Sequence, residues 1–155
     1  MADLTPADPG PRHILRGPAG GAALGGLIVP DQPCRAAEAG PRAALWLGPD
    51  EWLLLGFAAV ETPFAVVDVG HRSLGFRLAG PRAAELLAGG VPLDLSPAAF
   101  PVGTCTRTIF EKAEIVLWRR AEAAWHIEVA RSFAPYLCDM IAAIAAANGI
   151  GGQER

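Results

Sequence analysis

The sequence predicts an α+β domain in which a mostly antiparallel sheet has its helices packed on one face. Short apolar, β-branched or aromatic runs bounded by Gly and Pro recur along the 155 residues, as in strands joined by tight turns. Only two segments after residue 72 have helical periodicity, and the order there is strand, helix, three strands, helix. This grouping is typical of an antiparallel sheet with segregated helices.

The chain is the size of one domain, but its beginning differs in composition from the rest. Residues 1–42 hold 7 Gly and 7 Pro, whereas the remaining 113 residues hold 18 of the two types together. We therefore predict a partly packed Gly/Pro-rich arm at 1–42, an α+β domain at 43–149 and a loose tail at 150–155.

Within the arm, the first ten residues are expected to be a loose tail. A short strand is expected at 13–16, and Pro18 is suited to the first turn of a short helix at 18–28. The Pro- and Gly-punctuated stretch 29–41 is expected to be a loop. The arm could repeat the strand and helix order of the later chain, which would make two degenerate halves sharing one sheet.

Two apolar runs at 43–47 and 52–55 flank the sequence Gly48-Pro49-Asp50-Glu51, which predicts a β-hairpin with Pro at a central turn position. A helix is expected after Gly80-Pro81, and Gly89-Gly90 would end it. The remaining strands are expected at 64–69, 72–78, 104–110, 114–118 and 124–130.

The last helix is expected to begin after Ser132, a good N-cap residue, and to end at Asn148-Gly149. One face of this helix carries apolar side chains at helical spacing: Phe133, Tyr136, Leu137, Met140, Ile141 and Ile144. Its other side holds Ala, Pro and Cys with a single charge, Asp139. Either an Ala-rich coding bias or a covering protein partner would explain so little charge.

Composition excludes several function classes. The net charge of -3 and the scattered Arg residues leave no basic stripe for nucleic acid. No apolar stretch reaches the roughly 18 residues of a membrane span, and the N-terminus does not have the pattern of a secretory signal. We therefore predict a cytoplasmic protein. The three widely spaced cysteines form no CxxC pair and are expected to be free thiols.

The sequence contains no dinucleotide fingerprint, P-loop, GxSxG or HExxH motif, and we assign no catalytic, cofactor-binding or metal-binding residue. Asp68 and His71 are the most suggestive pair, because an Asp near a His can orient a base. The alternative is that Asp68 caps a turn and His71 packs at the strand junction. Cys105 is expected to be a buried thiol, and His126, which alternates with Trp125, to be exposed or at an interface.

Four segments resemble the gamma subunit family of heterotetrameric sarcosine oxidase, and together they cover most of residues 43–141. PLDLSPAAFPVGTCTRT is a fairly specific run among them. The segments are LWLGPDEWL at 45–53, VVDVGHRSLGFRLAGPRAAELLAGGVPLDLSPAAFPVGTCTRTIF at 66–110, IVLWR at 115–119 and EVARSFAPYL at 128–137.

The resemblance implies a fold akin to the folate-binding aminomethyltransferase (glycine cleavage T-protein) domain, whose Asp-x-x-His turn and Gly-Pro helix are similar to VVDVGHRSLGFRLAGPRAAELL. It further implies a non-catalytic structural subunit of a complex that oxidatively demethylates sarcosine to glycine. The partners would be alpha, beta and delta subunits, which would hold FAD, FMN, NAD, tetrahydrofolate and zinc, with no cofactor in this chain.

Two alternatives stay open. The chain could be a stand-alone folate-binding aminomethyltransferase-like protein, or it could have the same subunit role in an N-methylglutamate dehydrogenase. For a subunit, we expect contact residues in the last helix, in the Gly/Pro-rich N-terminal arm and among the Arg side chains, which are favoured at interfaces. The candidate interface residues are Arg72, Arg77, Arg107, Arg131, Ala134, Cys138 and Ala142.

Overall fold

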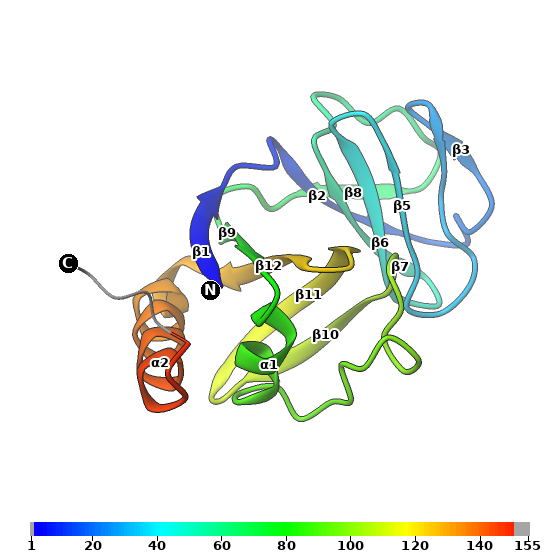
Figure 1. Cartoon of the computed structure of the whole chain (residues 1–155). Helices are drawn as coiled ribbons and strands as arrows, with labels where there is room; N and C mark the ends of the chain where they lie inside the picture. Colours follow the sequence, from blue (N-terminus) through cyan, green and yellow to red (C-terminus); the bar gives the residue numbers. More distant parts are fainter. Residues whose placement is uncertain (1, 151–155) are drawn as a thin grey trace.

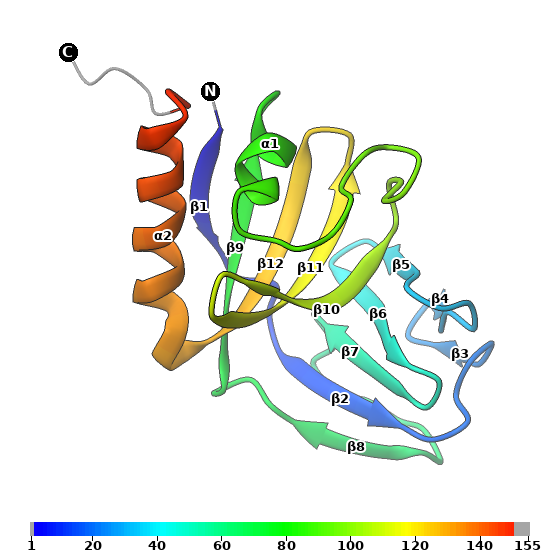
Figure 2. The same cartoon turned by 90° about the horizontal axis from the view of Figure 1, so that it is seen from below.

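The structure, a computed structural model, describes residues 2–150 of the chain. These residues form two five-stranded antiparallel sheets, a two-stranded hairpin and two α-helices (Figures 1 and 2). The prediction of a sheet-rich domain with few helices is confirmed. The expectation of one shared sheet is wrong, because the strands before residue 70, apart from the first, pair among themselves.

The first sheet has the strand order β1 (Asp3–Ala7), β9 (Ser73–Ala79), β12 (Ala124–Ala130), β11 (Ala113–Ala121) and β10 (Cys105–Phe110). The second sheet has the order β5 (Ala36–Ala39), β6 (Arg42–Gly48), β7 (Glu51–Leu55), β2 (Arg12–Arg16) and β8 (Ala65–Asp68). The predicted hairpin, the strand expected at 13–16 and the five later strands are confirmed, with ends that agree to within three residues.

The expected loose tail at the N-terminus is wrong, because β1 forms an edge of the first sheet and pairs with β9 from Asp3 opposite Ala79 to Ala7 opposite Gly75. Leu4 is half-buried and contacts the core. Pro6 argues against a strand in the sequence, but an edge strand tolerates the missing N–H. Ile150, at the start of the other predicted tail, is buried and donates its N–H to Ala145 O at 2.8 Å; residues 151–155 lie outside the described part.

The helix expected at 18–28 is wrong. That segment forms the small hairpin β3 (Ala23–Leu24) and β4 (Leu27–Ile28). Gly25 and Gly26, at the turn, have φ angles of +53° and +87°, a region that glycine adopts at no steric cost. A Cβ on Gly25 would lie 2.6 Å from the Phe57 ring. The loop expected at 29–41 also contains the short strand β5.

Helix α1 (Ala83–Ala88) and helix α2 (Ala134–Ala147) agree with the predicted helices. Ser132 is not the N-cap, because Arg131–Phe133 forms a 3-10 turn and Phe133 precedes α2 without a side-chain cap. At the other end, Arg82 donates to the carbonyls of Asn148 and Gly149, which supplies donors to groups a helix end leaves free. No helix within residues 2–150 has the length and apolar character to cross a membrane.

Buried apolar side chains form three clusters that order the molecule in layers. The first joins the helices to one face of the first sheet, as Leu86 and Leu137 contact the layer that contains Trp125. The second lies between the sheets and includes Ile14, Leu45, Leu53, Cys105 and Trp118. The third joins the outer face of the second sheet to the small hairpin and includes Leu15, Leu24, Trp52 and Phe57.

Candidate functional site

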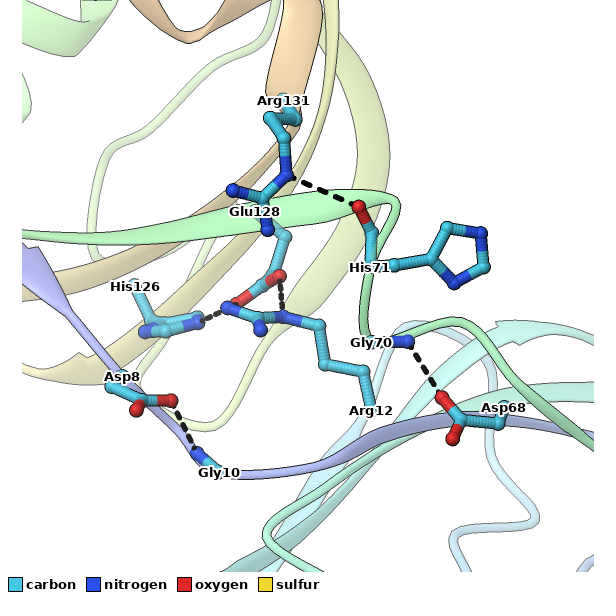
Figure 3. A network of polar contacts seen from close by, with 9 residues as sticks. All are labelled: Asp8, Gly10, Arg12, Asp68, Gly70, His71, His126, Glu128 and Arg131. Carbon is cyan, nitrogen blue, oxygen red and sulfur yellow. Dashed lines mark hydrogen bonds and ion pairs between the residues drawn. The ribbon is translucent and has the colours of Figure 1, made fainter.

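A charged network is buried between the two sheets (Figure 3). The Nε of Arg12 donates to Glu128 Oε2 at 2.6 Å, and its second guanidinium nitrogen lies 3.4 Å from Oε1. His126 Nε2 lies 2.6 Å from the same Oε1. The exposed fractions are 7% for Arg12, 4% for His126 and 3% for Glu128. The carboxylate therefore bridges a strand of each sheet, although Arg12 and Glu128 are 116 positions apart in the sequence.

Alternation along β12 builds this network. Trp125, Ile127 and Val129 join the core beneath the helices, so His126 and Glu128 point to the opposite face, toward the second sheet. The expectation that His126 is exposed or at an interface is wrong, because the second sheet covers this face. The Trp118 ring packs edge-on to the imidazole, with 6.1 Å between the ring centroids.

Gly75 makes room for the network. It lies on β9 opposite Glu128, and a Cβ there would sit 2.8 Å from Glu128 Oε1 and 2.5 Å from the carbonyl oxygen of Ala7. The glycine therefore lets the carboxylate and the β1 edge approach the same point. Sequence reasoning missed Arg12 and Glu128. The sequence did contain a signal for Glu128, because it lies two residues after His126 on the strand face opposite the apolar side chains.

The polar groups of the network bind one another inside the protein. Each carboxylate oxygen of Glu128 already faces a donor, and the guanidinium and imidazole are covered by protein atoms. A buried pair in this geometry holds the two sheets in register and leaves no free base for a substrate. Within residues 2–150, no three His, Cys, Asp or Glu side chains are grouped so as to hold a metal ion.

Asp68 and His71 do not form a catalytic pair. The Oδ1 of Asp68 accepts the N–H of Gly70 at 2.9 Å, so the interpretation of Asp68 as a turn cap is confirmed. The expectation that His71 packs at the strand junction is wrong, because its ring is exposed and turns away from Asp68 in Figure 3. The backbone of His71 has a structural contact, because Arg131 Nε donates to its carbonyl oxygen at 3.1 Å.

Cys105 is fully buried between the sheets, as expected, and its thiol donates to the carbonyl oxygen of Trp46 at 3.5 Å. Burial raises the pKa of this thiol to about 12. Because only the thiolate reacts, we expect iodoacetamide at pH 8 to alkylate Cys105 at least about 100-fold more slowly in folded than in unfolded protein. Mass spectrometry of quenched time points measures this, with half-buried Cys34 as internal reference. Equal rates for the two thiols would contradict it.

The candidate interface residues have different positions. Ala134 is only 5% exposed and contacts the core under the helices, so its side chain has no surface to offer a partner. Cys138 is half-buried against the same core. Arg107 is exposed and lies 3.2 Å from Glu51. The other candidates are exposed: Arg72, Arg77, Arg131 and Ala142.

The chain's relationships agree with the resemblance in its sequence. The family model "Sarcosine oxidase, gamma subunit family" matches residues 19–147. The chain belongs to this family. Two curated relatives named sarcosine oxidase subunit gamma, from Corynebacterium sp. (strain U-96) and Arthrobacter sp., are 34% and 32% identical to it over 109 and 130 residues. These alignments cover 63% and 74% of this chain.

The aligned segments cover 53% and 64% of these two relatives, so the chain spans between half and two thirds of the length of the gamma subunits it matches. In three dimensions the likeness extends over nearly the whole chain. It matches a chain of the heterotetrameric sarcosine oxidase from Corynebacterium sp. U-96, solved with pyrrole 2-carboxylate, with a TM-score of 0.81 and 28% identity. The match covers 99% of this chain and 87% of that one.

Proposed function

We propose that this member of the gamma subunit family is a non-catalytic structural subunit of a heterotetrameric sarcosine oxidase in the cytoplasm. The assembly would oxidatively demethylate sarcosine to glycine. The observation that carries the proposal is the three-dimensional match over 99% of the chain with a chain of such a heterotetramer. The fold of this chain is therefore the one a gamma subunit brings to the complex.

The structural role is supported by the way the chain uses its polar groups. Its buried charged network joins the two sheets through Glu128, and the Asp68 carboxylate closes a turn. Both groups stabilise the fold in these positions. We propose that FAD, FMN, NAD, tetrahydrofolate and zinc are held by the alpha, beta and delta subunits, which would be the partners of this chain.

A finer part of the proposal concerns ancestry. Asp68 at the end of β8, His71 in the turn that follows, and the Gly80-Pro81 pair shortly before α1 support kinship with the folate-binding aminomethyltransferase domain. In that view the chain has the fold of the aminomethyltransferase domain, but its role is to contact the other subunits of the complex. The stand-alone folate-binding alternative is less favoured, because the Asp68 carboxylate is engaged by Gly70 and His71 turns away.

Co-expression with the three neighbouring subunits tests the proposal. We expect an affinity tag on this chain to retain a flavin-containing complex in stoichiometric amount, and omission of this chain to lower the yield of active complex at least tenfold. Assaying the complex with sarcosine and with N-methylglutamate separates the two substrate alternatives. A tag that retains no flavoprotein, or full assembly and activity without this chain, would contradict the proposal.

A further inference from the structure

A groove with a volume of about 670 Å³ lies between the open ends of the two sheets. Ile14, Leu53 and Val69 line it from the second sheet and the turn after β8, and Ile115 and Val116 line it from β11. Aliphatic side chains make up half of its lining, and most of the others are charged. Glu128 of the buried network also lines the groove.

Two large apolar side chains are exposed where this groove meets the solvent. Val67 on β8 is 56% exposed and Phe133 before α2 is 45% exposed, and both belong to the groove lining. Exposed apolar side chains beside a groove with aliphatic lining are a feature of binding sites in soluble proteins. An apolar side chain from another molecule would be removed from water by seating here.

Strand β8 forms an open edge beside this surface. Within residues 2–150 it pairs with β2 alone and is the last strand of the second sheet (Figure 2). An edge strand presents unpaired backbone N–H and C=O groups, which are a template for an added extended chain. The open edge of β8 favours a polypeptide over a small molecule as the occupant. A polypeptide can form backbone hydrogen bonds with this edge and at the same time place a side chain in the groove.

The charged side chains around the groove indicate which charge the bound polypeptide has. The groove lining includes the carboxylates of Glu51, Glu114 and Glu128. Each of them already has a cationic partner: Arg16 and Arg107 lie 3.6 and 3.2 Å from Glu51, Arg107 also lies 3.6 Å from Glu114, and Arg12 donates to Glu128. Arg72 and Lys112 also line the groove, and neither has an ion-pair partner within residues 2–150. These two free cations belong to a chain whose net charge is -3. The groove is therefore complementary to carboxylates.

We propose that this groove binds an extended segment of a partner subunit, with an apolar side chain seated between the sheets and acidic side chains at Arg72 and Lys112. The proposal rests on the subunit role proposed above and names the surface and the chemistry of the contact. The segment adds to the β8 edge, and its alternate side chains enter the groove.

Charge reversal in the co-expressed four-subunit complex tests the contact. We expect the double variant Arg72→Glu/Lys112→Glu to retain about tenfold less partner subunit at equal concentration, because two attractions become repulsions. Arg35→Glu is the matched control, since Arg35 is exposed, has no ion pair within residues 2–150 and lies outside the groove. Thermal unfolding of each isolated variant checks that the fold is intact.

A photo-crosslinking amino acid in place of Val67 identifies the occupant. We expect a crosslink to a partner peptide that contains Asp or Glu. The same amino acid in place of Ile28, which is 59% exposed on the remote small hairpin, is expected to give no such product. A crosslink from Val67 only to a second copy of this chain, or to no polypeptide at all, would overturn the proposal.

The outcomes separate this proposal from the subunit role. If the wild-type chain retains no partner, both are wrong. If the wild-type chain and the charge-reversed variant retain equal amounts of partner, the subunit role stands and the groove proposal is wrong. Loss of partner in the groove variant but not in Arg35→Glu supports the proposal, and equal loss in both overturns it.

Discussion

Replacing Glu128 with alanine is expected to lower the free energy of unfolding by about 3–5 kcal/mol, because it leaves a buried guanidinium without its counter-charge. Arg12 is 7% exposed and His126 is 4% exposed, so neither side chain can recover its lost bond from bulk water. Urea unfolding followed by tryptophan fluorescence measures the change, since Trp118 packs against His126.

Two variants make this result specific. Glu114→Ala removes a carboxylate with a 74% exposed side chain from β11 and is expected to change stability by no more than about 0.5 kcal/mol. The double variant Arg12→Met/Glu128→Leu removes both charges and is expected to be more stable than Glu128→Ala alone. A loss below about 1 kcal/mol for Glu128→Ala would contradict a network that joins the sheets.

Gly75→Ala is expected to lower the free energy of unfolding by about 3 kcal/mol, the upper end of the range for an added methyl group in a filled site. The methyl group would lie 2.5 Å from the Ala7 carbonyl oxygen and 2.8 Å from Glu128 Oε1, so β1 and the carboxylate cannot both keep their positions. Hydrogen exchange is expected to show faster opening of β1, and urea unfolding measures the loss.

The matched control is Gly48→Ala, another strand glycine, where the nearest atom to an added Cβ is 3.7 Å away. Its expected change is within about 1 kcal/mol. If both variants lose the same stability, the loss comes from glycine replacement in a strand in general, and the proposed crowding at Gly75 is wrong.

Local patterns predicted the elements whose own residues specify them. The hairpin around Gly48-Pro49 and the last helix follow from turn chemistry and from helical spacing of apolar side chains. β1 was missed because its stability comes from pairing with β9, about 70 residues later, and Pro6 argues locally against a strand. The 18–28 helix was predicted from Pro18, whereas the glycine turn and the Phe57 contact favour a hairpin.

The buried network was missed for the same reason. Alternation on β12 places His126 and Glu128 on one face, but it does not tell whether solvent or another layer covers that face. The second sheet covers that face. Arg12 lies on β2, a strand within the segment that was predicted to be an arm. The turn-capping role of Asp68, by contrast, involves only neighbouring residues and was among the alternatives.

The long span between Arg12 and Glu128 has a consequence for how the chain folds as it is synthesised. All strands of the second sheet have been synthesised once residue 68 has left the ribosome. The face of this sheet that packs on the network stays uncovered until β12 has been made, about sixty residues later. β1, the first strand made, also stays unpaired until β9 emerges. Such distant pairings slow folding, so the nascent half-domain exposes Arg12 and an apolar sheet face for a long interval.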